Sequence, residues 1–239
     1  MDRLRPMFPF YGSKWRAAPK YPPPRTGDLI IEPFAGSASY SLFHHKEHKV
    51  HLNDVDPTIA GIWRYLIDAS PEEIRKLPTN VNNTDELNMP QSVKDLIGFW
   101  FTKATPVPAK EKVGWARNGG YAVQYWSEGR RDRIADQVRD IEDWKITSVS
   151  YKNLGNPRAT WFVDPPYEGV PGRSYKHNQI DYAHLLEWCK DRIGQVIICE
   201  NKGATWLKGL KHHPLGKFKT VREKKSTEIY CHLINGKSV

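Results

Sequence analysis

Trp161-Phe162-Val163-Asp164-Pro165-Pro166-Tyr167 is the stretch around which the rest of this 239-residue chain can be interpreted. Its first three residues form an apolar run, which predicts a buried strand that ends where the polar cluster begins. Prolines fix the backbone and remove N–H donors, so the local carbonyl groups face outward as acceptors. Asp164, the two prolines and Tyr167 therefore predict a cup for a flat ring that carries an amine.

The chemistry of such a cup follows from its acceptors. An exocyclic amine can donate one hydrogen to Asp164 and the other to the carbonyl of Pro165. The amine nitrogen is then drawn out of conjugation, and its lone pair points toward an electrophile, while Tyr167 can stack on the ring. The simpler interpretation, a strand followed by a proline-rich turn, remains open at this point.

Several short apolar runs bounded by turn residues predict further parallel strands, and helical patterns lie between them. The expected strands are 29–31, 50–52, 146–151, 161–163 and 196–199, and the expected helices are 39–45, 57–66 and 182–191. In the second helix Pro57 suits the first helical position and Asp56 can cap it. Alternating strands and helices predict an α/β fold, an open sheet whose ligands gather at the carboxyl ends of the strands.

Two segments break this alternation. Residues 67–140 contain no convincing strand, begin with a helix capped by Ser70 and finish with a helix near 129–142, which predicts a small helical insertion. Phe218–Val221 and Thr227–Ile234 alternate in polarity around a charged turn, which predicts an antiparallel hairpin at the sheet edge. The expected organisation is a catalytic domain of residues 1–66 and 141–239, interrupted by an insertion at 67–140.

Three further stretches suit a small-molecule site. Glu32–Ser39 is a strand-to-helix turn of small residues, where a backbone can approach a ligand closely. Asn53-Asp54 ends the next strand, where an acid can hold the ribose hydroxyls of a nucleoside. Phe10–Lys14 precedes the first strand and could pack on a cofactor and pair with a carboxylate. Taken alone, this stretch would be interpreted as a polar loop.

Composition and charge narrow the class of partner. A net charge of +9 and an isoelectric point near 9.4 indicate a polyanionic partner, most commonly nucleic acid. Cys189, Cys199 and Cys231 are unclustered, so neither a disulfide framework nor a metal site is expected. No leader-like or membrane-spanning apolar stretch stands out, and we expect a cytoplasmic, nucleoid-associated protein without a membrane partner.

Taken together, Phe10–Lys14, Glu32–Ser39, Asp54 and Asp164–Tyr167 resemble motifs X, I, II and IV, in that order. This is the order of the Dam-like, or D12-class, N6-adenine DNA methyltransferases of the α group. The resemblance covers residues 8–66 and 146–234 and puts the insertion where that family has its target-recognition domain. It implies a Rossmann-like, mostly parallel methyltransferase sheet, S-adenosylmethionine as cofactor with no metal, and double-stranded DNA as partner.

The resemblance also implies roles for individual residues. Catalysis would fall to Asp164, Pro165, Pro166 and Tyr167. The cofactor site would be formed by Phe10, Tyr11, Lys14, Glu32, Phe34, Gly36 and Asp54. Two departures stand out: Ala38 occupies a position where the family often has a second glycine, and the Phe10 segment lacks the usual Trp and Gly-Gly.

DNA contact must help to extrude the target base, because unstacking and unpairing cost a few kcal/mol. Basic and amide side chains of the insertion and of the loop after the cup are the candidates. They are Lys103, Arg117, Asn118, Arg130, Arg131, Arg133, Arg173 and Lys176. Solvated surface positions are the simpler interpretation for any one of them.

The sequence therefore predicts an enzyme, a site-specific adenine DNA methyltransferase that acts by base flipping. The same chemistry on N4 of cytosine or on adenine in RNA is the nearest alternative. A DNA-binding protein that keeps the fold without turnover is the second. The recognition sequence, the oligomeric state and the biological role are not determined by the sequence.

Overall fold

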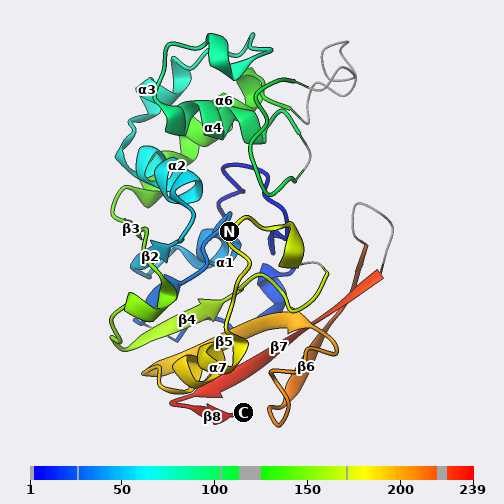
Figure 1. The fold of residues 1–239 in the computed structure, drawn as a ribbon. Coiled ribbons are helices and arrows are strands. Elements are labelled where there is room, and N and C mark those ends of the chain that lie inside the picture. Colours follow the sequence, from blue (N-terminus) through cyan, green and yellow to red (C-terminus); the bar gives the residue numbers. More distant parts are fainter. Residues whose placement is uncertain (1–2, 26, 103, 113–124, 171, 220–224) are drawn as a thin grey trace.

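A mixed β-sheet forms the centre of the molecule, with strand order β3-β2-β1-β4-β5-β7-β6 and β8 beside β7 (Figure 1). The computed structural model describes residues 3–25, 27–102, 104–112, 125–170, 172–219 and 225–239. The parallel strands are β1 (Leu29–Glu32), β2 (Val50–Asn53), β3 (Lys145–Thr147), β4 (Ala159–Val163) and β5 (Gly194–Asn201). The antiparallel strands are β6 (His212–Lys219), β7 (Lys225–Ile234) and β8 (Lys237–Ser238). The predicted Rossmann-like sheet with a C-terminal antiparallel hairpin is confirmed.

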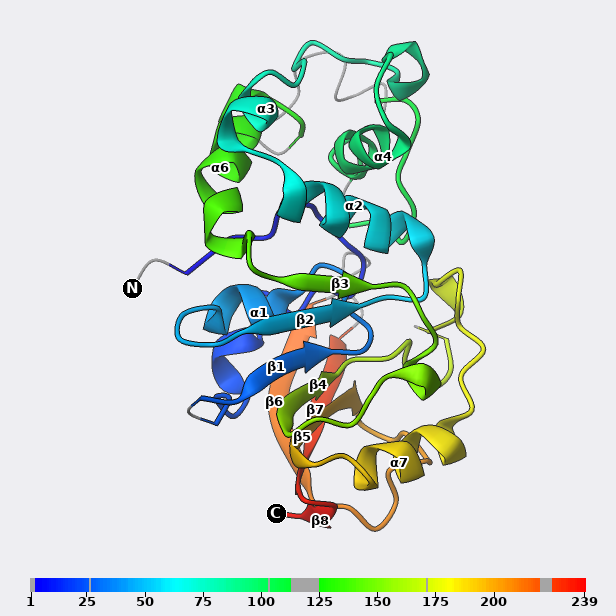
Figure 2. The same cartoon turned by 90° about the vertical axis from the view of Figure 1, so that its left-hand side faces the viewer.

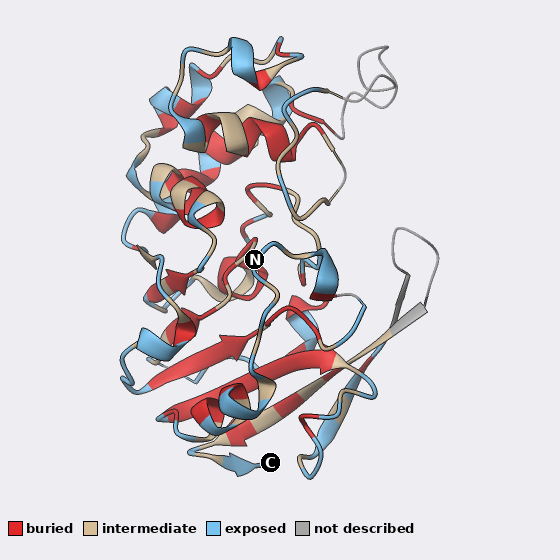
Figure 3. Cartoon of the chain, in the orientation of Figure 1, coloured by how far each residue is buried: buried red, intermediate tan, exposed pale blue. Residues whose placement is uncertain are grey.

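The central strand is β4, which pairs with β1 on one side and β5 on the other. All five of its residues are buried (Figure 3). Phe162 joins the hydrophobic core on one face of the sheet, and Trp161 and Val163 join the core on the other face. A strand covered on both faces reads as a continuous apolar run, which is why the sequence shows it clearly.

The helices expected between strands are present close to their predicted bounds. They are α1 (Ser39–His44), α2 (Pro57–Asp68) and α7 (Tyr182–Lys190). Asp56 caps α2 by accepting from the Thr58 amide at 2.9 Å, and Pro57 occupies the first turn, as predicted.

The insertion forms a helical group beyond the β3 edge of the sheet (Figure 2). Its helices are α3 (Pro71–Arg75), α4 (Gln91–Phe99) and α6 (Glu128–Gln137), the last continued by a 3-10 helix at Val138–Ile141. Ser70 and Glu73 form a reciprocal capping box at the start of α3. Helix α4 was not predicted, because no side chain caps its first turn and it follows an Asn-rich polar stretch.

Two predicted strands differ from the observed ones. The strand expected at 146–151 ends at Thr147, since Asn53 Oδ1 accepts from the Val149 amide at 3.2 Å and a 3-10 helix begins at Tyr151. The first hairpin strand starts at His212 rather than Phe218, and a register shift between Pro214 and Gly216 obscures its alternation. Most of the predicted turn between the strands lies outside the described residues.

Three properties of the described ranges bear on function. No helix in them is long and apolar enough to cross a bilayer. No three His, Cys, Asp or Glu side chains in them are grouped so as to hold a metal ion. Cys189, Cys199 and Cys231 are buried and unpaired, as predicted for the first two.

Gly194 offers a test of the packing between β4 and β5. It has φ of +111°, and an added Cβ would collide with the Ala159 carbonyl oxygen. We expect Gly194→Ala to lower the free energy of unfolding by more than about 2 kcal/mol, measured by urea denaturation. Gly203→Ala is the matched control, with φ of +104° but nothing within 4 Å, and should cost only about 1 kcal/mol. Equal losses would show that the strand end relaxes around the methyl group.

Candidate active site

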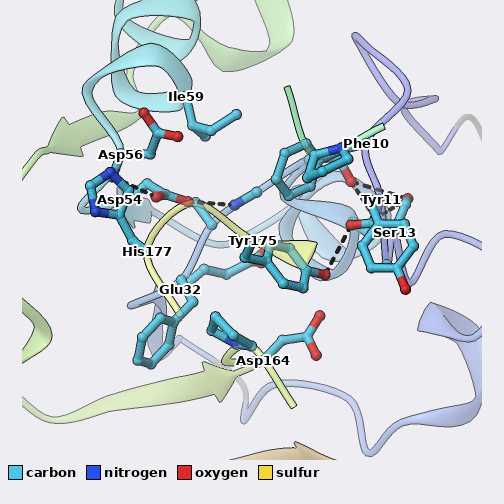
Figure 4. Close-up of a pocket in the computed structure, with 18 of the residues that line it drawn as sticks. Phe10, Tyr11, Ser13, Glu32, Asp54, Asp56, Ile59, Asp164, Tyr175 and His177 are labelled. Atoms are coloured by element: carbon cyan, nitrogen blue, oxygen red, sulfur yellow. Dashed lines mark hydrogen bonds between the residues drawn. The ribbon is translucent and has the colours of Figure 1, made fainter. Parts of the chain in front are cut away.

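A cavity opens at the carboxyl ends of β1, β2 and β4 (Figure 4). Each of these strands delivers an acid to it: Glu32 from β1, Asp54 after β2 and Asp164 after β4. The N-terminal segment crosses the cavity with Phe10, Tyr11 and Lys14, and the β1–α1 turn contributes Phe34 and Gly36. Every predicted cofactor residue therefore lines this one cavity. Asp164 and Pro166 line the cavity too. Pro165 and Tyr167 are their neighbours in the chain but are not among the residues that line it.

The β1–α1 turn is tightly folded. Gly36 has φ of +46°, and a Cβ there would lie 3.0 Å from the ring of Phe10. Ala38 also has a left-handed backbone, with φ of +47°, which an L-residue adopts at a cost of about 1–2 kcal/mol. Glu32 Oε1 accepts from the Ser41 amide at 2.7 Å, so the first acid braces the helix that follows the turn. The turn can thus present its backbone closely to a ligand.

Asp54 is tied to the same turn. Its Oδ2 accepts from the Gly36 amide and its Oδ1 from the Asp56 amide, both at 2.9 Å. Burial raises the pKa of Asp54 to about 6, against the effect of these two amides. The carboxylate is therefore fixed in direction, and each oxygen keeps a lone pair for a ligand hydroxyl.

The cup at the end of β4 is held by an ion pair. Lys14 Nζ lies 3.0 Å from Asp164 Oδ2, and only 5% of the lysine and 19% of the aspartate side chain are exposed. The same ammonium donates to the Gly12 carbonyl at 2.7 Å and lies 4.7 Å from the centre of the Tyr167 ring. Asp164 Oδ1 and the Tyr167 hydroxyl are buried, and neither makes a hydrogen bond of good geometry among the described residues. The two groups are nevertheless near neighbours, because the Tyr167 hydroxyl lowers the pKa of Asp164.

Comparison with known families agrees with this arrangement. Residues 10–93 match the family model of the D12 class N6 adenine-specific DNA methyltransferases. The match covers 84 of the 239 residues, and this part of the chain is similar to that family. By this match the predicted enzyme class, an adenine-specific DNA methyltransferase, is confirmed. No curated protein matches the chain.

The matched stretch of the methyltransferase contains Phe10–Lys14, the β1–α1 turn and Asp54, but not the cup. The structure supplies the missing connection, because Asp164 lines the same cavity as these residues. The α-group assignment stays a prediction.

Residues that the sequence analysis did not single out hold the cup from behind. Tyr182 Oη donates to the Pro166 carbonyl at 2.7 Å. The buried Glu200 accepts from the Glu168 amide and from Trp206 Nε1, both at 3.0 Å. These contacts join α7 and β5 to the loop after β4, and no local sequence signal marks them because the partners are far apart in the chain.

The loop after the cup also reaches the N-terminal segment of the methyltransferase. Tyr175 Oη donates to the Tyr11 carbonyl at 3.1 Å, and its ring packs against Phe10 and Tyr11. Gly12 has no room for a Cβ because the Tyr175 hydroxyl lies there. Tyr175 therefore covers one side of the cavity.

A second cavity adjoins the first at the ends of β1, β2 and β3. Phe34, Val55, Lys176 and His177 line both cavities. Tyr151 borders the second cavity and packs against Phe34 with ring centres 5.4 Å apart. The two cavities together could hold an elongated ligand.

The predicted DNA contacts fall into four groups. Lys103, Arg117 and Asn118 lie outside the described residues. Arg173 and Lys176 are exposed on the loop after the cup. Arg130 is partly buried, with its guanidinium 5.0 Å from the centre of the Trp100 ring.

Arg131 and Arg133 are partly buried and bind neighbouring parts of the chain. Arg131 binds Asp132 at 2.8 Å and reaches the Leu77 carbonyl, and Arg133 donates to the Pro6 carbonyl at 2.9 Å. Burial lowers the pKa of Arg133 to about 10. These two arginines hold α6 against neighbouring segments, and their contact with DNA stays a prediction.

The buried Glu32 should make the stability of the protein depend on pH. Burial raises its pKa from 4.5 to about 8, although the Ser41 contacts oppose the shift. An acid with a raised folded pKa favours folding most below its unfolded pKa, and that contribution is lost as pH rises through the folded pKa.

Glu32→Gln keeps an oxygen for Ser41 and removes the charge. We expect the variant to gain stability over wild type, by on the order of a few kcal/mol, as pH rises from 5 to 8 in urea denaturation. A difference that stays constant with pH would show that Glu32 carries its charge at little cost.

Proposed function

We propose that this methyltransferase transfers the methyl group of S-adenosylmethionine to the N6 amine of an adenine extruded from duplex DNA. The observation that carries the proposal is one cavity that gathers Glu32, Asp54 and Asp164, with Asp164 Oδ1 buried and making no hydrogen bond of good geometry among the described residues. Acceptors for a cationic cofactor and an acceptor for an amine thus lie side by side.

The residues of the cavity fit the proposed cofactor. S-adenosylmethionine, when bound, supplies a methyl group already activated by its attachment to a positively charged sulfur. The Glu32–Gly36 turn would hold the methionine part, and Asp54 would accept from the ribose hydroxyls. Phe10 and Tyr11 would pack against the molecule. The adjoining cavity beside Phe34 offers room for the adenine end.

The cup would orient the target amine. Asp164 Oδ1 accepts one N6 hydrogen and the Pro165 carbonyl accepts the other, since the Pro166 carbonyl is already bound by Tyr182. The nitrogen lone pair is then free to form the new N–C bond, while the bond between the methyl carbon and sulfur would break and leave its electron pair on the sulfur. The nitrogen gives up one proton in the reaction, and Asp164 is the nearest acceptor in this arrangement. Positioning and electrostatics suffice for this chemistry.

The extruded base would stack on Tyr167, which returns ~1–3 kcal/mol of the cost of extrusion. Contacts to the DNA backbone must supply much of the remainder. For these we propose Arg173 and Lys176 beside the cavity and Arg130 on α6, together with Lys103, Arg117 and Asn118. The insertion at 67–140 would then serve as the target-recognition domain of a catalytic domain formed by 1–66 and 141–239.

The direct test is incubation of the purified protein with labelled S-adenosylmethionine and unmodified DNA, followed by digestion to nucleosides. Label in N6-methyladenosine supports the proposal. Label in N4-methylcytosine, or transfer to RNA alone, would replace the substrate while keeping the mechanism. Binding to DNA with no transfer to any nucleic acid would favour a protein that has lost turnover.

Asp164→Ala should abolish methyl transfer. The variant removes the acceptor of the amine and leaves the exposed Arg173 and Lys176 in place, so DNA affinity should change by less than about threefold. Transfer is measured by the labelled assay and affinity by fluorescence anisotropy. Activity that survives this change would disprove the proposed role of the cup.

Arg173→Ala and Lys176→Ala should each weaken DNA binding. If each side chain neutralises one phosphate, the slope of log K against log salt should become less steep by about 1 per variant. Lys190→Ala on α7 is the control: it removes a surface lysine that pairs with Glu187, and the slope should not change. Unchanged slopes for the two loop variants would remove this loop from the DNA interface.

A further inference from the structure

Lys14 contacts the cup rather than the cofactor turn. The family resemblance assigns it to the cofactor site, but its ammonium binds Asp164 Oδ2 and the Gly12 carbonyl and lies over the Tyr167 ring. All three contacts belong either to the lysine's own segment or to the cup. Lys14 thus lines the same cavity as the β1–α1 turn, but its ammonium is directed to the cup.

The surroundings of Asp164 are rich in acids. Burial raises the pKa of Asp164, and the charge of Lys14 opposes that rise. Three further carboxyl groups, Glu32 from β1, Glu200 from β5 and Glu228 from β7, lie close enough to interact with Asp164. The other titratable groups that interact with it are Tyr21, Tyr167, Tyr175 and Cys199.

Lys14 is the cation that offsets these acids within the described part of the chain. Burial alone would lower its pKa, but Asp164 first and Glu228 next raise it above the ordinary value. The ammonium therefore stays charged across the range in which enzymes work. It shields Asp164 from its acidic neighbours at all those pH values.

The two oxygens of Asp164 are left in different states. Oδ2 is held by Lys14 at 3.0 Å, whereas Oδ1 is buried and makes no hydrogen bond of good geometry among the described residues. The Tyr167 hydroxyl lies near enough to the carboxylate to lower the pKa of Asp164, but it does not complete a hydrogen bond to Oδ1. A buried carboxylate oxygen without a partner is costly unless a ligand supplies the missing donor. The amine of the target base is such a donor.

We propose that Lys14 is a positioning residue for the target amine: it fixes Asp164 through Oδ2, holds the carboxylate in its charged form and leaves Oδ1 as the acceptor. This inference rests on the proposed function of the cup. Because the ammonium also covers the Tyr167 ring, the incoming base must move the lysine side chain along that ring while the contact with Oδ2 is kept.

Lys14→Met and Lys14→Arg test the proposal through the pH dependence of methyl transfer. Without the cation, the pKa of Asp164 should rise, so the acidic limb of kcat/KM should move up by about 1–2 pH units in the Met variant. At neutral pH kcat should fall by roughly a hundredfold, with KM for S-adenosylmethionine changed by less than about threefold. Arginine keeps the charge and alters the geometry, so its acidic limb should stay within about half a unit of wild type while kcat falls.

Binding of S-adenosylmethionine, measured by calorimetry, separates this role from one in the cofactor site. Affinity that falls in parallel with activity in the Met variant would overturn the proposal, and so would an acidic limb that does not move. Lys190→Met breaks a distant surface pair with Glu187 and should behave as wild type. If the Met variant does not fold, the Arg variant provides the test. An acidic limb of kcat/KM that moves in the Arg variant as far as expected for loss of the charge would overturn the proposal. Failure of the proposed function itself would appear differently, as wild-type protein that forms no N6-methyladenosine.

Discussion

The Lys14–Asp164 ion pair joins the N-terminal segment to the end of the central strand, and the geometry of the site depends on it. Both partners are largely buried, so loss of either would leave an uncompensated charge, at a cost of about 3–5 kcal/mol. The pair fixes the segment that carries Phe10 over Gly36 and Tyr11 against Tyr175. One contact between residues 150 positions apart thus connects the N-terminal segment, the β1–α1 turn and the cup around one cavity.

The strand β4 makes this contact possible. Because its side chains are buried on both faces and it pairs on both edges, the backbone leaves the sheet at a fixed point after Val163. Tyr182 and Glu200 then fix the next residues from α7 and β5. The cup is therefore rigid on the side away from the cavity, as a site that relies on orientation requires.

The sequence predicted the features that arise from local patterns. The apolar runs at Ile30-Ile31 and Trp161–Val163 revealed buried parallel strands, and Asp56 and Ser70 marked helix starts through their capping chemistry. Parallel topology then brought Glu32, Asp54 and Asp164 together, because the carboxyl ends of neighbouring strands meet at one sheet edge. The gathering of these acids could be expected before the structure was seen, although their individual roles remain proposals.

The features that escaped prediction depend on distant partners. Nothing near Arg133 shows that the Pro6 carbonyl will receive its guanidinium, and nothing near Tyr175 shows that it will cover Tyr11. Lys14 illustrates the same limit, since a cofactor and a carboxylate were both possible partners and only the fold distinguishes them. Local propensity cannot report such contacts, because they form only when the whole sheet has brought the segments together.

The free protein holds several arrangements that cost stability, and they share one explanation. Burial raises the pKa of Glu32 to about 8 and of Asp54 to about 6. Ionising either group therefore lowers the free energy of unfolding. Ala38 adds a left-handed backbone at the same turn. A cationic ligand in this cavity would stabilise both carboxylates and recover part of that cost as binding free energy. The two acids at this turn are therefore suited to a cationic ligand, in agreement with the proposed sulfonium cofactor, and the local strain is consistent with a site shaped for its ligand.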